Sequence, residues 1–321
     1  MRSGSTGRTR ITRHHTLALA LVACAIAARA EPHWSTAHPL PEPLQEFSAA
    51  VLDGKIYIAG GIDQGNKPTT HAYRYDPTTD TWERIGDLPA ARHHMPLAVA
   101  HDTLYAVGGL AGNPFQGQST LWAYRPDLNI WLERARLPVA RGASAVAEVD
   151  GQLIVVGGIR FVALGGLAVG TAIYDPATNT WRRGANIPVP RDHLTAQAVG
   201  GIMYAIGGRP LDPDRNYNIV EAYDLKTNQW TTKDSMPTRR GGIGSAVLDG
   251  KIHVLGGESR AGVFTEHEVY DPATNRWSTA LPLPTGRHGL GVVSLGGKIY
   301  VIGGGPRPAY GQTDVVDIFT P

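Results

Sequence analysis

The sequence predicts an all-β protein in which one four-stranded unit is repeated six times around a common axis. Gly-Gly pairs end apolar runs at intervals of 47 to 50 residues. Glycine (39 residues) and proline (23 residues) together exceed their usual share of a 321-residue chain, as is typical of turn-rich β proteins. A radial repeat of small antiparallel sheets is a β-propeller. The pairs are Gly60-Gly61, Gly108-Gly109, Gly157-Gly158, Gly207-Gly208, Gly256-Gly257 and Gly303-Gly304.

The first unit shows how each repeat is interpreted. Residues 48–52 form an apolar run that predicts a buried inner strand, and Asp53-Gly54 predicts a tight hairpin turn. Residues 55–59 follow as the second strand, closed by glycines that permit positive φ and close backbone approach. Residues 71–75 predict a third strand, and Trp82 begins the fourth. Equivalent turn pairs recur at Asp150-Gly151, Gly200-Gly201, Asp249-Gly250 and Gly296-Gly297.

The two ends of the repeat region complement each other. The sixth repeat stops at Phe319-Thr320-Pro321 and lacks the strand that carries a tryptophan in the other repeats. Trp34 stands before the first repeat. We therefore expect the N-terminal segment to supply the outer strand of the last blade, which closes the ring and leaves no exposed sheet edge there.

An aromatic turn followed by a tryptophan comes after each of the first five Gly-Gly pairs. The five copies are Tyr75-Asp76-Pro77 with Trp82, Tyr124-Arg125-Pro126 with Trp131, Tyr174-Asp175-Pro176 with Trp181, Tyr223-Asp224-Leu225 with Trp230, and Tyr270-Asp271-Pro272 with Trp277. This series resembles the Kelch repeat over residues 34 to 321. The resemblance implies a six-bladed Kelch β-propeller spanning residues 31–321, with four antiparallel strands in each blade.

The first thirty residues resemble a leader. Four arginines lie within the first thirteen residues, and an apolar run from Leu17 to Ala28 ends in a small-x-small sequence before Glu31. This pattern is typical of a secretory signal peptide. Because Leu21-Val22-Ala23-Cys24 resembles the bacterial lipobox, two routes stay open: cleavage after Ala30, or lipidation at Cys24. Both predict an exported protein, periplasmic or secreted, that contacts a membrane only if Cys24 is lipidated.

Charge and cysteine content exclude several functions. The net charge is +2, but residues 1–30 hold five arginines and no acids, so that without them 25 basic residues face 28 acidic ones and the charge becomes −3. We therefore expect no nucleic-acid partner. Cys24 is the only cysteine, so cleavage after Ala30 leaves no disulfide, thiol nucleophile or cysteine-based zinc site. The copper radical site of galactose oxidase, which shares the Kelch architecture, needs a cysteine and is excluded.

The loop that enters each inner strand predicts the functional face. Sixteen residues before the Gly-Gly pair, five of the six blades carry an arginine, which we interpret as a structural tie to neighbouring carbonyls. The next two positions differ between blades and are expected to ring the mouth of the central channel. By resemblance, animal Kelch substrate adaptors bind peptides through these positions. They read Gln45-Glu46, His93-His94, Gly142-Ala143, Asp192-His193, Gly241-Gly242 and His288-Gly289.

The second loop of each blade adds charged and aromatic candidates on the same face. Flat rings beside bidentate donors and carboxylates suit sugars, although such aromatics also pack loop against loop. The candidates for ligand binding from these loops are Arg160, Arg209, Glu258, Arg260, Arg307 and Tyr310.

These residues support three hypotheses for function. The first is an extracytoplasmic propeller, expected to be monomeric and without a cofactor, that binds a carbohydrate or a polypeptide at its polar mouth. The second is a sugar mutarotase or epimerase in which Glu46, His94 and His193 act as acid and base. It rests on analogy with exported bacterial Kelch propellers that are sialic acid mutarotases. The third is a metal-dependent enzyme with His94, His288 and Glu46 as weak candidate ligands.

Overall fold

The computed structural model describes residues 1, 3–7, 31–161 and 166–321. The signal peptide and lipobox predictions concern residues that lie mostly outside these ranges, Cys24 included. Residues 32–321 form one compact unit. None of the described helical segments is long and apolar enough to cross a membrane.

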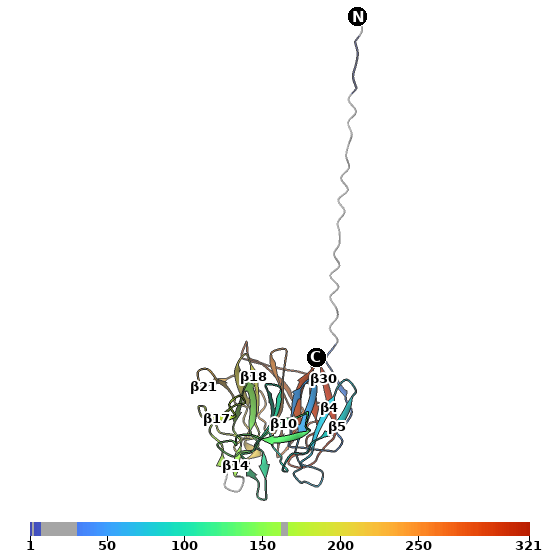
Figure 1. Ribbon diagram of the computed structural model, residues 1–321. Coiled ribbons are helices and arrows are strands. Elements are labelled where there is room, and N and C mark those ends of the chain that lie inside the picture. The colour runs from blue at the N-terminus through green and yellow to red at the C-terminus, as the bar shows by residue number, and fades with distance from the viewer. Residues whose placement is uncertain (2, 8–30, 162–165) are drawn as a thin grey trace. The chain divides into compact units, whose positions relative to one another are not determined.

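Seven four-stranded antiparallel sheets occur in the described residues of this unit, and six of them are the blades (Figure 1). Blades 1 to 3 are β2 (Ser48–Leu52), β3 (Lys55–Ala59), β4 (Ala72–Asp76) and β5 (Thr81–Ile85); β6 (Leu97–Ala100), β7 (Thr103–Val107), β10 (Leu121–Arg125) and β11 (Ile130–Glu133); and β12 (Ala145–Val149), β13 (Gln152–Val156), β16 (Ala172–Asp175) and β17 (Thr180–Arg183). Blades 4 to 6 are β18 (Thr195–Val199), β19 (Ile202–Ile206), β20 (Val220–Asp224) and β21 (Gln229–Lys233); β22 (Gly244–Leu248), β23 (Lys251–Leu255), β26 (His267–Asp271) and β27 (Arg276–Thr279); and β28 (Gly291–Leu295), β29 (Lys298–Ile302), β30 (Val316–Thr320) and β1 (His33–Thr36).

The predicted strands and turns of blade 1 are confirmed to within one residue. The inner two strands have the predicted bounds, the third begins at Ala72 instead of residue 71, and the fourth begins at Thr81. Asp53 and Gly54 both have positive φ, 49° and 69°, as the tight hairpin requires. Blade 2 makes the same turn with His101 and Asp102, whose φ values are also positive.

The N-terminal strand completes blade 6, as expected. Strand β1 pairs with β30 so that Trp34 lies opposite Phe319, with ring centroids 5.3 Å apart. In blade 1, Tyr75 and Trp82 occupy the equivalent pair at 5.0 Å. The indole N–H of each of these tryptophans also donates to a backbone carbonyl beside the preceding blade, as Trp34 does to Leu281 at 3.3 Å. Trp34 therefore replaces the tryptophan that the sixth repeat lacks.

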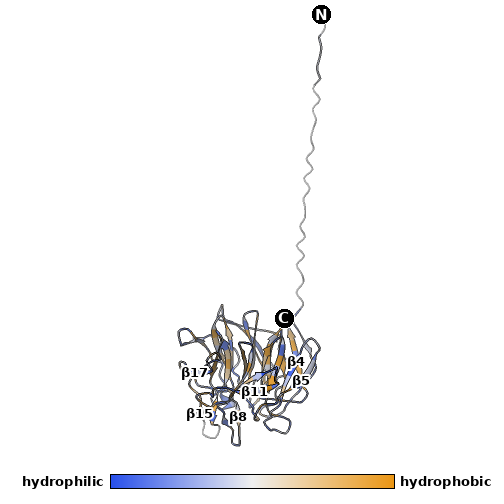
Figure 2. Cartoon of the chain, in the orientation of Figure 1, coloured by the Kyte–Doolittle hydropathy of each residue, from blue (hydrophilic) through white to orange (hydrophobic). Residues whose placement is uncertain are grey.

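The hydrophobic core lies between neighbouring blades. Six apolar clusters within the described residues each join two adjacent sheets, and one of them joins Tyr300 and Ile302 of blade 6 to Ile56 and Ile58 of blade 1. In Figure 2, the orange colour that marks hydrophobic residues is accordingly found mainly on the strands. Because every blade buries apolar side chains against both neighbours, blade 6 and blade 1 contact each other as the other neighbours do.

The Gly-Gly pairs bring neighbouring blades close together. Gly60 has a φ of 69°, and a Cβ at this position would lie 2.4 Å from the carbonyl oxygen of Arg92 in blade 2. Gly61 donates its N–H to that same carbonyl at 2.8 Å. In the last blade, Gly304 donates to the carbonyl of Leu44 at 2.8 Å. Glycine is required because the next blade's backbone occupies the space of a side chain.

The recurring arginines form a buried layer, as the structural interpretation expected. Arg191 is fully buried, donates to the carbonyls of Gly207, Val189 and Ala205, and pairs with the carboxylate of Glu221. In two other blades the same role is taken by pairs at 2.6 Å, Arg240 with Glu268 and Arg287 with Asp317. Among the described residues no carboxylate pairs with Arg141, which is held by the carbonyls of Val139, Gly157 and Gly170.

The long second loops of blades 2 and 3 join each other. Strands β8 (Leu110–Ala111), β9 (Gln116–Gly117), β14 (Ile159–Phe161) and β15 (Gly166–Leu167) form a small sheet in which Phe161 pairs with Gln116. Blade 5 has a short hairpin, β24 (Glu258–Ser259) and β25 (Gly262–Val263). Blade 4 has one 3₁₀ turn, η1 (Pro213–Arg215). The described part of the second loop of blade 3 is therefore paired with the second loop of blade 2.

Candidate functional site

Six backbone hydrogen bonds run from blade to blade around the axis. In each blade the residue two positions after the arginine position donates its N–H to the carbonyl of its counterpart in the preceding blade, at 2.7–3.0 Å, and Glu46 returns the chain of bonds to Gly289. All six residues have φ between 51° and 67°, a conformation that non-glycine residues rarely adopt. We call this set the hub ring: Glu46, His94, Ala143, His193, Gly242 and Gly289.

Glu46 stands between two histidines of the neighbouring blades. Its Oε2 lies 2.9 Å from Nε2 of His94 in blade 2, and its Oε1 lies 3.3 Å from Nε2 of His288 in blade 6. Oε2 of Glu258 lies 3.6 Å from the same nitrogen of His288. His288 is fully buried, and its Nδ1 faces the carbonyl of Gly305 at 3.1 Å. The predicted convergence of blades 6, 1 and 2 is therefore present, centred on one carboxylate.

A second chain of contacts reaches His94 from the opposite side of the axis. Nε2 of His94 lies 3.0 Å from Nε2 of His193 in blade 4, and the Nδ1 of His193 contacts the carboxylate of Asp192. The Nδ1 of His94 lies 2.5 Å from the Nδ1 of His93. His93 and Asp192 are fully buried, so they support the two hub-ring histidines from behind.

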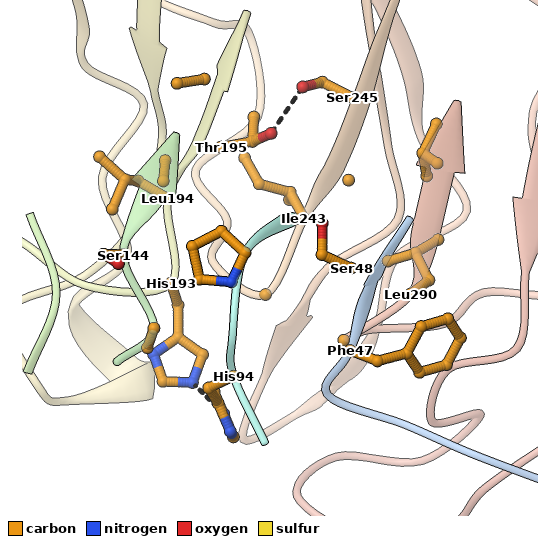
Figure 3. Close-up of a pocket in the computed structure, with 18 of the residues that line it drawn as sticks. Phe47, Ser48, His94, Ser144, His193, Leu194, Thr195, Ile243, Ser245 and Leu290 are labelled. Atoms are coloured by element: carbon orange, nitrogen blue, oxygen red, sulfur yellow. Dashed lines mark hydrogen bonds between the residues drawn. The ribbon is translucent and has the colours of Figure 1, made fainter. Parts of the chain in front are cut away.

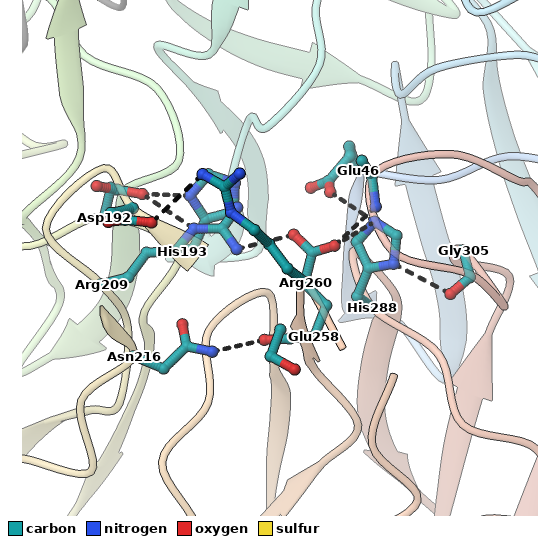
Figure 4. A network of polar contacts seen from close by, with 12 residues as sticks. Glu46, Asp192, His193, Arg209, Asn216, Glu258, Arg260, His288 and Gly305 are labelled. Carbon is teal, nitrogen blue, oxygen red and sulfur yellow. Dashed lines mark hydrogen bonds and ion pairs between the residues drawn. The ribbon is translucent and has the colours of Figure 1, made fainter. Parts of the chain in front are cut away.

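Arg209 connects the carboxylates of blades 4 and 5 (Figure 4). Its Nη1 donates to Oε1 of Glu258 at 2.8 Å, and its Nε lies 3.7 Å from Oδ1 of Asp192. The side chain of Asn216 donates to the backbone carbonyl of Glu258 at 2.6 Å. Two carboxylates, those of Asp192 and Glu258, thus flank this guanidinium, and His288 connects Glu258 to Glu46.

The contacts in the network displace the pKa values of its members. Burial acts to raise the pKa of the Glu46 carboxyl, but His94 and His288 outweigh it and hold that pKa well below its usual range. Burial lowers the pKa of His193, and Arg209 adds to the effect. Burial acts to lower the pKa of His288, yet Glu46 and Glu258 raise it overall. Glu46 is therefore an ionised carboxylate at neutral pH, and His193 is a neutral imidazole.

Two cavities meet at the hub ring. The mouth pocket, of about 430 Å³, opens on the loop face and has Gln45, Arg209, Arg260, Tyr310 and Phe115 among its lining residues. The channel pocket, of about 150 Å³, lies among the inner strands, and Figure 3 shows the rings of His94 and His193 toward each other there. Glu46, His94 and His193 line both cavities.

Comparison with known proteins gives the family. The KLHDC2/KLHL20/DRC7 Kelch-repeats domain matches residues 134–304, and the Kelch motif matches residues 43–89. The first of these matches covers more than half of the chain. The chain belongs to the Kelch-repeat family.

Related proteins resemble this Kelch propeller over part of their length. Kelch-like protein 35 of Mus musculus is 30% identical over 125 residues, which are 39% of this chain and 21% of the mouse protein. Kelch-like protein 25 of Xenopus tropicalis is 34% identical over 108 residues, 34% of this chain and 18% of that protein. The solved structure of YjhT superposes with a TM-score of 0.77 at 16% identity, covering 89% of this chain and 97% of that one. The chain thus spans about a fifth of these Kelch-like relatives, and the whole of the YjhT fold.

Not all of the candidate residues reach the mouth pocket. Arg160 is exposed and lines a separate pocket of about 230 Å³ together with Arg141 and Arg182. Arg307 is exposed on its loop and is not among the residues that line the mouth. These two arginines therefore lie outside the lining of the mouth pocket, although Pro308, Ala309 and Tyr310, from the same loop as Arg307, line it.

One contributor to the site was missed by sequence reasoning. Asn216 is buried against Glu258. Phe115, one of the aromatic residues of the second loops, packs its ring edge against His93 with centroids 4.4 Å apart. The position directly after each Gly-Gly pair bridges to the first of the two mouth positions, as Arg209 does to Asp192 and Glu258 does to Gly241. The fixed spacing from the Gly-Gly pair therefore indicates from the sequence that Arg209 and Glu258 lie beside the mouth positions. No repeat spacing marks Asn216, which lies after η1 in a loop peculiar to blade 4.

Proposed function

We propose that this Kelch propeller is an extracytoplasmic protein that binds a carbohydrate ring in the mouth pocket. The observation that carries the proposal is the combination of a pocket of about 430 Å³, a floor of buried charged groups and a rim that includes Phe115 and Tyr310. Ligand pockets of a few hundred cubic ångströms with a few fixed polar groups are typical of small-molecule sites. The location outside the cytoplasm is supported by the leader pattern of residues 1–30.

The rim and the floor offer different contacts to a sugar. Tyr310 and Arg260 each expose about two thirds of their surface, so an aromatic face and a guanidinium are accessible at the rim. Asp214 holds Nε of Arg260 at 2.8 Å, which orients that guanidinium. On the floor, Glu46 and His94 provide an acceptor and a ring nitrogen only 2.9 Å apart. Stacking on the rim with paired hydrogen bonds on the floor suits a pyranose better than an extended polypeptide.

The Glu46–His94 contact favours a second candidate function, mutarotation of the bound sugar. Glu46 is held ionised, so its carboxylate is able to take the proton of an anomeric hydroxyl. The imidazole of His94, when protonated, is able to give a proton to the ring oxygen of the sugar. The ring C–O bond then breaks as the carbonyl forms. Reclosure on the other face of the carbonyl, with both protons returned, gives the other anomer, and no atoms are gained or lost.

Binding is tested by calorimetry against a panel of neutral sugars, hexuronic acids and sialic acids. We expect one class to bind the full chain, and Glu46→Ala combined with His94→Ala to weaken that binding at least about tenfold while melting changes little. Arg160→Ala is the matched control, because Arg160 lies outside the mouth pocket. A different result would favour a polypeptide ligand: neither the unmodified chain nor the double variant binds a sugar, and the unmodified chain binds a polypeptide that the double variant does not. That result would replace the carbohydrate proposal.

Mutarotation is tested separately by following anomer equilibration in proton NMR spectra. The expected result is equilibration faster than in buffer for the sugar that binds, and a rate equal to buffer for Glu46→Gln. If a sugar binds tightly while its anomers equilibrate at the buffer rate, binding stands and the catalytic candidate is refuted.

A further inference from the structure

Three donor atoms from three blades converge at the floor of the mouth pocket. Oε2 of Glu46, Nε2 of His94 and Nε2 of His193 all lie within 4.8 Å of one another. His94 stands in the middle, 2.9 Å from the carboxylate and 3.0 Å from the other imidazole. The backbone of the hub ring fixes where these side chains begin, because each of the three residues is held by two hydrogen bonds of that ring.

The three converging side chains have few hydrogen-bond donors to satisfy the lone pairs that they point at one another. The carboxylate of Asp192 only accepts hydrogen bonds, so Nδ1 of His193 donates to it, and Nε2 is the ring nitrogen of His193 that is left to bind a metal. Glu46 presents carboxylate lone pairs. A single hydrogen, on Nε2 of His94, would have to serve both neighbours at once. A cation placed between the three atoms satisfies every lone pair.

The separations match metal coordination. With metal–ligand bonds of about 2.1 Å, donors that subtend angles between octahedral and tetrahedral values lie roughly 3.0 to 3.4 Å apart. The contacts of His94 with Glu46 and His193, at 2.9 and 3.0 Å, lie just below and at the lower limit of this range, and all three donor atoms lie within 4.8 Å of one another. Two imidazoles with one carboxylate form a donor set that suits zinc and ferrous iron.

Each imidazole is also supported through its other nitrogen. Asp192 contacts the Nδ1 of His193, and Nδ1 of His93 lies 2.5 Å from Nδ1 of His94. Such outer contacts set the tautomer and ring orientation of metal-binding histidines. Asp192 is itself fixed by the backbone N–H of Leu211 at 2.7 Å, so the support extends into the loop of blade 4.

We propose that Glu46, His94 and His193 bind one divalent transition metal, zinc or ferrous iron, with an open coordination position toward the mouth pocket. All three residues line that pocket, so a bound molecule is able to reach the metal. The metal site deepens the proposed function. It rests on that function in one respect only, the kind of molecule that the metal would contact. A second trio, Glu46, Glu258 and His288, has one imidazole instead of two and is the competing assignment.

The test measures metal alone, without sugar. The full chain is stripped with a chelator, titrated with Co²⁺ under visible absorption, and loaded with Zn²⁺ for elemental analysis after gel filtration. We expect one equivalent of metal and ligand-field bands of Co²⁺ bound to nitrogen. His94→Gln and His193→Gln are expected to lose the metal, and Asp192→Asn to weaken its affinity about 10- to 100-fold. His101→Asn, in an exposed hairpin turn, is the control that keeps the metal.

The outcomes separate the competing explanations. Less than a tenth of an equivalent on the unmodified chain overturns the proposal, as does a His288→Gln variant that loses the metal while His94→Gln retains it. Circular dichroism melting shows which variants fold. If His94→Gln does not fold, the graded loss in Asp192→Asn decides. Sugar binding in the presence of EDTA is measured in parallel, so that failure of the metal site and failure of the carbohydrate site are distinguishable.

Discussion

The arginine layer and the hub ring lie two positions apart in the sequence, and different rules govern their residues. Arg92, Arg141, Arg191, Arg240 and Arg287 repeat in five blades and bind backbone carbonyls. The two positions that follow vary in every blade, and only at blades 1, 2, 4 and 6 do they carry ionisable side chains. The same loop thus holds a constant residue that fixes the backbone and variable residues that face the axis. Repetition marks structural support here, and variation marks the site.

Removing a carboxylate from the arginine layer is expected to give the largest effect. Glu221→Gln leaves the buried guanidinium of Arg191 without its counter-charge, which should cost about 3–5 kcal/mol in the free energy of unfolding. Urea denaturation measures this. Glu83→Gln, which removes the exposed partner of Arg74, is the control and should cost less than about 1 kcal/mol. Equal costs in the two variants would show that the layer is not a structural one.

A buried histidine pair away from the hub predicts how stability depends on pH. His253 and His267 in blade 5 face each other at 2.8 Å, and burial lowers the pKa of each to about 4. Because the folded-state pKa lies below the unfolded value of 6.5, the neutral pair is tolerated above pH 6.5, and stability is lost as the pH falls from 6.5 toward 4. We expect each histidine to lose about 2 kcal/mol of stability between pH 7 and pH 5.

Urea midpoints at pH 7, 6 and 5 measure this loss. The double variant His253→Gln with His267→Gln should flatten the profile between pH 6.5 and 5. A profile of unchanged steepness would assign the acid sensitivity to other groups, the hub histidines first.

Two glycines of the hub ring allow a comparison of strain with crowding. A Cβ on Gly289 would lie 2.6 Å from Cδ of Glu46, whereas a Cβ on Gly242 would meet its nearest atom, of His288, at 3.4 Å. Both residues have positive φ, so alanine costs about 1–2 kcal/mol at either position. Only Gly289→Ala should also displace Glu46 and weaken binding at the mouth. Thermal melting and metal titration of the two variants separate these effects, and identical losses of binding would contradict the assigned position of Glu46.

Arg160→Ala is expected to give the smallest effect. The side chain is exposed and lies over the ring of Phe161, 5.4 Å from its centroid. Its removal should change the free energy of unfolding by less than about 0.5 kcal/mol. Calorimetry with the sugar that binds the unmodified chain should show no change in affinity. A measurable loss would mean that the pocket beside Arg141 takes part in ligand binding.

The sequence was sufficient to predict the fold because each repeat contains its own constraints. The Gly-Gly pairs report a backbone contact with the next blade, and Trp34 reports the missing strand of blade 6, so blade number and closure follow from spacing alone. The convergence of Glu46, His94, His193 and His288 followed from their equivalent positions in the repeat. What spacing could not supply was direction in the long loops. The departure of Arg160 from the mouth depends on the pairing of β14 with β9 across two blades, and Asn216 follows a 3₁₀ turn that occurs, among the described residues, in blade 4 alone.

The closed ring of six backbone hydrogen bonds has a consequence for how ligand specificity changes between proteins of this architecture. Every one of the six peptide groups points along the tangent, head to tail, so their dipoles cancel and give the axis no electrostatic preference of its own. The electrostatic field that the hub ring exerts on a bound ligand then comes from the side chains of its six residues. Exchanging one of them leaves the other five anchored, so specificity in this architecture is open to revision one residue at a time.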